Sequence, residues 1–236
     1  MNLSLSLPRR VEPELLDHLD AHDPRAQRSR NDLRRLHRAM ATLTVLERAL
    51  DRATSGSPPH TIVELGAGDG SLMLRLANRR AARWPGVHVT LLDRLNLIAP
   101  RTLDAVRNLG WTPRVMAMDV FDWLARADAN LADIVFANLF IHHFSAEPLA
   151  RLLAGIAQRC RVFFCCEPRR SALPLAGSHL IGLLGAGPVT RKDAVSSVHA
   201  GFRGHELSAL WPNPSAWLLH ENSAGLFSHG FLAIRK

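Results

Sequence analysis

Short apolar runs alternate with helix-like stretches along most of the chain, and this alternation limits the fold more than any other feature. The stretches between the runs, at about 70–82, 97–109, 121–128 and 146–159, have helical patterns. The runs themselves are continuously apolar and occupy residues 61–65, 87–93, 114–118, 132–138 and 161–167. Strands that are buried on both faces and separated by helices belong to parallel sheets. The sequence therefore predicts an α/β fold with a doubly wound, mostly parallel sheet.

The N-terminal part of the chain has a helical pattern instead. Ser29 and Asp32 have the spacing of a capping pair, and the apolar residues that follow recur every three or four positions, at Leu33, Leu36, Met40, Leu43, Leu46 and Leu50. This pattern predicts one amphipathic helix. Because Ser-Gly-Ser-Pro-Pro at 55–59 has the composition of a linker, we expect a helical extension over 1–56 and the main domain over 60–236.

Residues 171–214 interrupt the alternation of runs and helices. The first part, 171–190, contains no Asp, Glu, Lys or Arg. Its two prolines and four glycines make it a poor membrane span, so we expect a buried helix and loop without stable membrane insertion. Thr190 and Asp193 form a second capping pair, which predicts a helix that ends near Gly201.

The C-terminal tail has the pattern of a hairpin. Residues 216–221 and 226–236 have strand character, and the segment 222–225 between them has turn residues. We therefore expect the chain to end in two antiparallel strands.

The charge balance suggests a nucleic-acid partner at first sight, but its distribution does not support one. The net charge is +8, from 29 basic and 21 acidic residues, and all but two of the basic residues are arginine. These arginines are spread over the extension and the main domain, and no basic arm or tail stands out. The sequence therefore disfavours nucleic acid as a partner.

Other features bear on the cellular compartment. The first ten residues lack the charged-then-apolar order of a signal peptide, which predicts a cytoplasmic location. Cys160, Cys165 and Cys166 are too few and too close together for a disulfide framework or a zinc site. We expect them to be reduced cysteines in the core.

The most specific motif is the glycine-rich loop VELGAGDG at residues 63–70. It lies between a predicted strand and a predicted helix, which is where α/β sheets bind nucleotide-like ligands. Its spacing is G-x-G-x-G rather than the G-x-G-x-x-G of dinucleotide-binding loops, and Glu64 stands two residues before the first glycine. Asp69 would place a negative charge where an NAD(P) loop binds pyrophosphate. The loop therefore favours a ligand with an amino-acid portion and no phosphate.

Polar side chains also end the next strands. Asp93 ends the second predicted strand, Asp119 follows the third, and Asn138 ends the fourth. Asp93 is suited to accept hydrogen bonds from ribose hydroxyls, and Asp119 from the exocyclic amine of adenine. An aspartate at a single strand end is more often a helix cap than a ligand contact, and Asp69 could also cap the helix that follows it. The joint pattern at successive strand ends favours a ligand site.

At these residues the chain resembles the class I S-adenosylmethionine-dependent methyltransferases, in particular their small-molecule, ubiquinone-biosynthesis-like branch. The resemblance rests on VELGAGDG (63–70), Asp93 in LLDR, Asp119 in MDV and ADIVFANLFIHHF (132–144), and it covers about 60–236. It implies a Rossmann-like sheet of seven strands with the last strand antiparallel. It also implies S-adenosylmethionine (SAM) as cofactor and S-adenosylhomocysteine (SAH) as product.

The resemblance implies a role for each matching residue. Glu64 lies near the methionine portion of the cofactor, Asp93 holds the ribose, and Asp119 with Val120 holds the adenine. The complete set of expected cofactor-binding residues is Glu64, Gly66, Ala67, Gly68, Gly70, Asp93, Arg94, Asp119, Val120 and Asn138.

The expected reaction is methyl transfer to a hydrophobic small-molecule acceptor, such as a phenol, a quinone-like or a polyketide-like compound, on oxygen or carbon. His142 and His143 directly follow the fourth strand, and either could act as general base, with His143 preferred. Either could instead cap or pack under the next helix. Glu167 could orient a histidine, bind substrate or pair with a neighbouring arginine. We expect no metal.

The added segments are expected to shape the site. Segments outside the shared core determine specificity in this superfamily, so 171–214 is predicted to cap the acceptor and 1–56 to form a lid or a dimer contact. The chain is expected to be a monomer or a homodimer.

Two other functions stay open from the sequence. Asn138-Leu139-Phe140-Ile141 partly resembles the N-L-P-[FY] motif of RNA adenine dimethylases, but Phe140 replaces the proline and Ile141 the stacking aromatic ring. The chain could also be a non-catalytic nucleotide-binding Rossmann protein, although its glycine spacing disfavours NAD.

Overall fold

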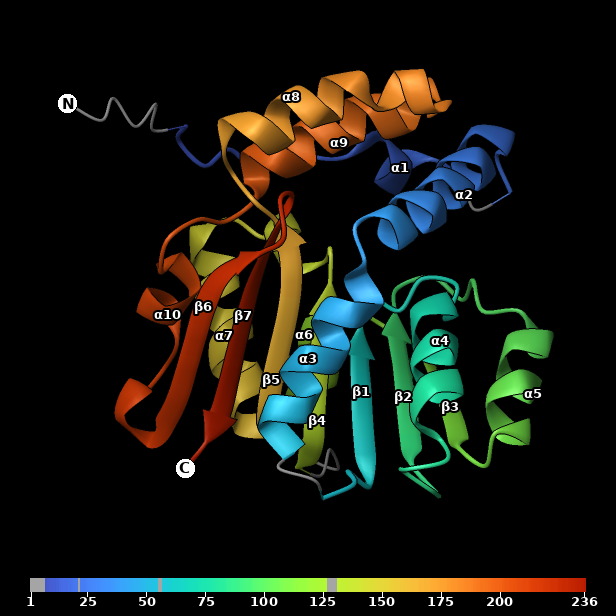
Figure 1. The fold of residues 1–236 in the computed structure, drawn as a ribbon, viewed down its shortest axis with the longest axis vertical. Helices are drawn as coiled ribbons and strands as arrows, with labels where there is room; N and C mark the ends of the chain where they lie inside the picture. Colours follow the sequence, from blue (N-terminus) through green and yellow to red (C-terminus); the bar gives the residue numbers. More distant parts are fainter. Residues whose placement is uncertain (1–6, 21, 55–56, 127–130) are drawn as a thin grey trace.

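A computed structural model describes residues 7–20, 22–54, 57–126 and 131–236, and its centre is one seven-stranded sheet (Figure 1). The strand order is β3-β2-β1-β4-β5-β7-β6, and β1 to β5 are parallel. β7 is antiparallel to both of its neighbours, β5 and β6. The strands are β1 (Thr61–Leu65), β2 (His88–Asp93), β3 (Thr112–Ala117), β4 (Ala132–Asn138), β5 (Cys160–Pro168), β6 (Trp217–Ala224) and β7 (Ser228–Arg235). The predicted α/β class, the doubly wound sheet and the antiparallel last strand are confirmed.

Helices cover both faces of the sheet (Figure 1). Because successive side chains of a strand point to opposite faces, Ile62 packs into one hydrophobic cluster and Val63 into the other. The first face carries α3 (Thr42–Thr54), α4 (Ser71–Arg80) and α5 (Pro100–Asn108). The second face carries α6 (Val120–Ala125), α7 (Ala146–Arg159) and α10 (Glu206–Leu210). Cys160, Cys165 and Cys166 are buried and free, as expected.

A further group of helices lies over the carboxyl ends of the parallel strands (Figure 1). It consists of α1 (Leu15–His18), α2 (Pro24–Ala39), α8 (Ala172–Leu180), η2 (Ile181–Leu184) and α9 (Pro188–Ala200). The short helices η1 (Ile141–His143) and η3 (Pro214–Ala216) complete the described elements. None of the helices in the described ranges combines the length and the apolar character needed to span a membrane. The N-terminal helices α1 and α2 thus meet the helices that follow β5 above the carboxyl ends of the parallel strands (Figure 1).

The prediction of one amphipathic helix over Leu33–Leu50 is wrong. The chain forms α2 and α3 instead, because Ala41 adopts a left-handed backbone conformation with φ 53°. The capping pair is also wrong: Asp23 caps α2 by accepting from the Arg25 amide at 2.8 Å. Asp32 lies in the middle of α2 and accepts from the Gly187 amide at 2.8 Å. A spacing typical of a cap therefore marks a contact between α2 and the start of α9.

The second capping pair is wrong for the same reason. α9 begins at Pro188, and its buried Thr190 donates from Oγ1 to Asp32 at 3.0 Å. Asp193 accepts from the backbone amides of Leu15 and Leu16 at 2.8 and 3.0 Å. These polar residues join the N-terminal helices to α9.

The segment 171–190 forms the predicted helix, but it is not buried. Leu183 is 84% exposed and Leu184 is 74% exposed. The helix α9 ends next to Gly201, and the terminal hairpin is confirmed. Its turn follows Ala224 rather than Glu221, because residues 222–224 still pair with β7.

Candidate functional site

Two connected cavities lie at the carboxyl ends of β1, β2 and β4. In the strand order, β1 and β4 are neighbours whose connections lead to opposite sides, and such a switch point leaves a crevice for a ligand. The first cavity has a volume of about 480 Å³ and is lined by residues of the glycine loop together with Glu64, Asp93, Asn138 and the two histidines. The second has a volume of about 540 Å³ and is lined by Asp93, Arg94, Asp119 and Val120, among others. Gly66, Asp93, Arg94 and His143 line both.

The glycine loop requires glycine for its backbone and for its packing. Gly66, Gly68 and Gly70 have φ angles of 68°, 55° and 71°, in the left-handed region that glycine adopts without strain. A Cβ atom on Gly66 would lie 2.5 Å from the ring of Phe140. Ala67 stands between Gly66 and Gly68 in the sequence and lines the first cavity. The backbone of this loop can therefore approach a ligand closely.

Two buried oxygens at this edge of the sheet have no hydrogen-bond partner among the described residues. They are Oε2 of Glu64 and Oδ1 of Asn138, and both residues line the first cavity. Burial, together with the charges of Asp69 and Asp93, raises the pKa of Glu64 well above its ordinary value. Unsatisfied buried acceptors are costly, so these two oxygens suit a ligand with hydrogen-bond donors. The ammonium group of an amino-acid portion is such a donor.

The strand-end aspartates are partly engaged by the backbone. Asp93 accepts from the amides of Gly68 and Leu95 at 2.8 and 2.9 Å. Asp119 caps α6 by accepting from the Phe121 amide at 2.8 Å, so the capping alternative holds for this residue. An ionised carboxylate can accept about four hydrogen bonds, so each aspartate keeps acceptor capacity toward the cavity it lines.

Asp69 also has a structural contact. Its carboxylate accepts from the Ser71 amide at 3.1 Å and pairs with Arg34 of α2 at 2.6 Å. The ion pair joins the glycine loop to α2.

His142 lies between two carboxylates that come from distant parts of the chain, Glu14 before α1 and Glu167 in β5. Its Nδ1 donates to Oε2 of Glu167 at 2.7 Å, and its Nε2 lies 3.4 Å from Oε1 of Glu14. Burial alone would lower the pKa of His142, but its hydrogen bonds with Glu14 and Glu167 raise it to about 9. The buried imidazole is therefore protonated at neutral pH. Glu167 thus contacts a histidine, as one of its predicted roles requires.

Glu167 also fixes the loop after β4. Its Oε1 accepts from the backbone amides of Phe140 and Ile141, each at 3.1 Å. The neighbouring Arg170 pairs with Glu206 instead.

His143 differs from His142 in environment and in charge. It lines both cavities, and its Nδ1 lies 3.7 Å from Oδ2 of Asp17 in α1. Burial and the charge of His142, whose ring centroid is 4.2 Å away, lower the pKa of His143 below its ordinary value. His143 is therefore neutral at pH 7 and can accept a proton.

Glu14, His142 and His143 have the residue types of a metal site. One potential ligand atom from each lies within 4.8 Å of the others. However, Glu14 also accepts a hydrogen bond from the Ser197 hydroxyl. Burial alone would raise the pKa of Glu14, but its hydrogen bonds and the nearby histidines, His142 above all, lower it below the ordinary value. We interpret the cluster as an ion-pair network that holds α1 and α9 against the site.

Leu139 and Glu14 line the site, but the sequence did not indicate them. Leu139 follows Asn138 in a left-handed conformation with φ 51°, which is rare for leucine and typical of functional sites. Glu14 reaches His142 from 128 residues away, so no local pattern could reveal it. Both also line a third, mostly apolar cavity of about 420 Å³.

The third cavity lies between the N-terminal helices and the segment 171–190. Glu14, Leu139 and Ser197 line both it and the first cavity, so the two adjoin. Its other walls are formed by apolar residues of α2, α8 and η2 and by Met40, which follows α2. They include Leu36, Pro174, Leu180 and Ile181.

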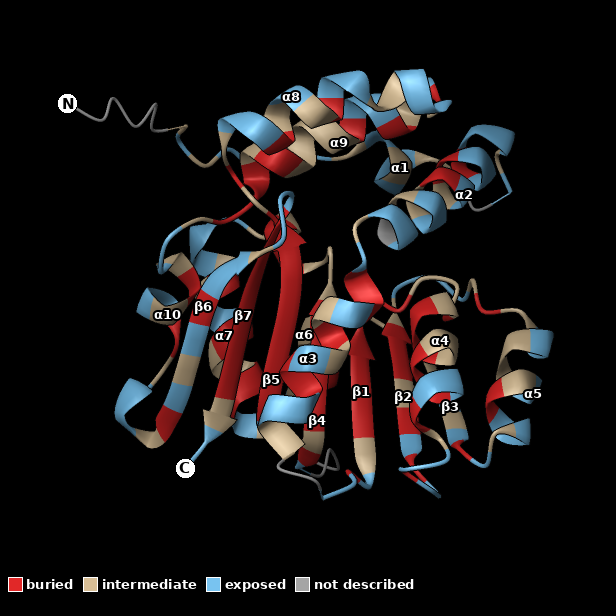
Figure 2. Cartoon of the chain, viewed as in Figure 1, coloured by how far each residue is buried: buried red, intermediate tan, exposed pale blue. Residues whose placement is uncertain are grey.

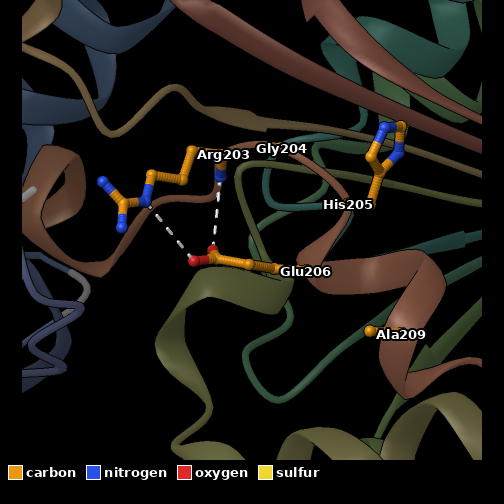
Figure 3. A pocket seen from close by; sticks show the side chains of 5 residues that line it. All are labelled: Arg203, Gly204, His205, Glu206 and Ala209. Atoms are coloured by element: carbon orange, nitrogen blue, oxygen red, sulfur yellow. Dashed lines mark hydrogen bonds and ion pairs between the residues drawn. The ribbon is translucent and has the colours of Figure 1, made fainter. Parts of the chain in front are cut away.

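A separate hollow beside α10 is not a candidate site (Figure 3). None of the predicted site residues lines it. Its charged residues, Arg203 and Glu206, point toward each other with Nε and Oε1 3.8 Å apart.

Comparisons with known proteins identify the fold. No protein-family model matches the chain, and no curated protein matches it significantly. The plantazolicin methyltransferase BpumL in complex with SAH is similar with a TM-score of 0.65 at 12% identity, over 91% of this chain and 92% of that chain. An O-methyltransferase family protein from Burkholderia thailandensis is similar with a TM-score of 0.56 at 16% identity, over 92% of this chain and 61% of that chain.

A third solved structure is the magnesium protoporphyrin IX methyltransferase (ChlM) from Synechocystis PCC 6803 with bound SAH. It is similar with a TM-score of 0.55 at 16% identity, over 87% of this chain and 94% of that chain. The three proteins share with this chain the architecture described above rather than a closely related sequence. The chain therefore has the Rossmann-like methyltransferase fold.

Proposed function

We propose that this protein transfers a methyl group from SAM to a hydrophobic small-molecule acceptor. The observation that carries the proposal is the junction of two unlike cavities at Leu139. One is a polar cavity at the switch point, with the unpartnered oxygens of Glu64 and Asn138, and the other is apolar. The shared fold with methyltransferases solved with SAH supports the assignment.

The residues of the two polar cavities fit the chemical groups of SAM. Glu64 and Asn138 would accept hydrogen bonds from its ammonium group, and Asp93 would accept from its ribose hydroxyls. Asp119, Val120 and Phe140 line the second cavity and would hold the adenine. When bound, SAM supplies a methyl group activated by its sulfonium charge. Gly66, Gly68 and Gly70 let the backbone follow the ligand.

The acceptor would occupy the apolar cavity. We propose that His143 is the general base for a hydroxyl acceptor, since it is neutral and lines the first cavity, which adjoins the apolar one at Leu139. His142 is already protonated, so it cannot take a second proton. Its role would be to position the β4 loop and α1 through Glu167 and Glu14.

The nucleic-acid alternative has less support. A base flipped out of a duplex is commonly held by stacking on an aromatic ring, and position 141 has a fully buried isoleucine instead. The wall of the third cavity is mostly apolar rather than basic.

The proposal can be tested with methyl-labelled SAM and the purified protein. We expect label in phenolic or quinol compounds of low polarity and none in RNA. His143→Gln should lower kcat at least a hundredfold for a hydroxyl acceptor, in line with general-base contributions, and leave SAH affinity unchanged. Asp104→Asn, at an exposed position of α5, is the matched control. Labelled RNA without labelled small molecules would contradict the proposal.

A further inference from the structure

An exposed apolar surface covers the outer side of the third cavity. It consists of residues from α8, η2 and the tip of the β6–β7 hairpin, and we call it the leucine face: Leu173, Leu180, Leu183, Leu184, Leu226 and Phe227, which are 53%, 57%, 84%, 74%, 62% and 37% exposed. Figure 2 shows the exposed side of α8 pointing away from the sheet. The hairpin tip and α8 are in contact, because a Cβ atom on Gly177 would lie 2.9 Å from the Phe227 ring.

The leucine face and the third cavity share residues. Leu180, Leu183, Leu184 and Phe227 line the cavity and are also exposed to solvent. The wall that separates the cavity from the outside is therefore only one layer of side chains. An apolar compound that passes between these side chains would enter the cavity directly.

Exposed cationic side chains border the leucine face. The segment 171–190 has no charged residue, and exposed cations stand next to it, at Arg28, Arg191 and Lys192. Arg28 donates from Nη2 to the carbonyl of Gly185 at 3.4 Å, and the Arg191 side chain lies against Gly182. Asp193, the next acid along the chain, is buried and accepts from the backbone of α1. An apolar surface with a cationic rim results.

We propose that the leucine face docks on the surface of a bilayer that contains anionic lipids. Helices that lie in a membrane interface combine exposed leucines with basic residues at the polar boundary, and they need neither the length nor the hydropathy of a spanning helix. Anionic headgroups attract the cationic rim. Exposed apolar surfaces of this kind mark interaction sites. The inference rests on the proposed function in one respect, since docking would bring the acceptor cavity to the membrane.

The rim charges favour a bilayer over a second copy of the chain. In a symmetric dimer the same patch of both copies would meet, and the cationic rim of one copy would lie against the cationic rim of the other. Like charges placed opposite each other oppose association, whereas phosphate headgroups neutralise them.

Flotation of the full chain with vesicles tests the proposal. We expect binding to vesicles of phosphatidylcholine with one third phosphatidylglycerol, and at least tenfold weaker binding to phosphatidylcholine alone. Arg191→Gln with Lys192→Gln should weaken binding to the anionic vesicles roughly thirtyfold, from about fivefold per basic residue. Arg79→Gln with Arg101→Gln, which removes the same charge from exposed positions of α4 and α5, should have no such effect.

A second pair of variants tests the apolar contribution. Leu183→Ser should weaken vesicle binding at least fivefold, whereas Leu218→Ser, 51% exposed on β6, should leave it unchanged. The docking proposal is overturned if the chain does not float with anionic vesicles, if the two double variants of basic residues weaken binding equally, or if Leu183→Ser only converts a dimer to a monomer. SAH affinity, measured on the same variants, reports on the proposed function separately. Normal SAH binding without flotation would overturn docking alone.

Discussion

Replacing Gly66 by alanine separates the function of the glycine loop from the cost of its backbone conformation. Gly66 has φ 68°, and a left-handed conformation costs an L-residue about 1–2 kcal/mol. The new methyl group would also lie 2.5 Å from Cδ2 of Phe140, so that ring must move. Overpacking of this kind costs about 1–3 kcal/mol. The free energy of unfolding of Gly66→Ala should therefore fall by about 2–5 kcal/mol.

Gly86→Ala is the matched control. Gly86 has φ 69°, but no atom lies within 4 Å of its would-be Cβ atom and it is remote from the cavities. This variant should lose only about 1–2 kcal/mol in urea denaturation and bind SAH normally in calorimetry. Gly66→Ala should bind SAH at least tenfold more weakly, because Phe140 lines the second cavity and would shift. Equal SAH affinity in the two variants would refute this account of the loop.

Two further predictions concern side chains of the site. Asp93→Asn should weaken SAH binding about tenfold or more in calorimetry, because it removes the carboxylate charge that serves both the Gly68 amide and the cavity. If Asp93→Asn binds SAH as tightly as the control Asp104→Asn, then Asp93 is not part of the site. His142, with a folded-state pKa of about 9 against 6.5, stabilises the fold fully below pH 6.5 and loses this contribution as the pH rises through 9. Urea unfolding should therefore show a loss of up to about 3 kcal/mol over this interval that His142→Gln lacks, and parallel curves for the two proteins would contradict the assignment.

The sheet could be predicted from the sequence because its strands are buried on both faces. Continuous apolar runs such as 132–138 leave little choice of secondary structure, and their order along the chain sets the topology. The polar residues that end these strands meet at one edge of the sheet, because parallel strands have their carboxyl ends on the same side. The lining positions of Glu64, Asp93 and Asn138 followed from the strand boundaries alone.

The helices above this edge could not be predicted as well. Ser29, Asp32, Thr190 and Asp193 have the spacing of helix caps, but their partners lie more than 150 residues away. The break at Ala41 has no glycine or proline to announce it. A local spacing indicates local hydrogen bonds, so it predicts a helix cap even where the polar side chains bond to distant residues.

The roles of the two histidines also depended on distant residues. His142 and His143 are adjacent in sequence, and only the position of His143 nearer the next helix favours it as the base. The structure distinguishes them because Glu14 and Glu167 both contact His142 and leave His143 facing the cavities.

Calorimetric titration of the full chain with SAH and, separately, with NADH tests the central claim most directly. The orphaned oxygens of Glu64 and Asn138 and the acid at position 69 favour a ligand with an ammonium group and no phosphate. We predict saturable heat at one site per chain with SAH and none with NADH. Heat with NADH and none with SAH would contradict the account.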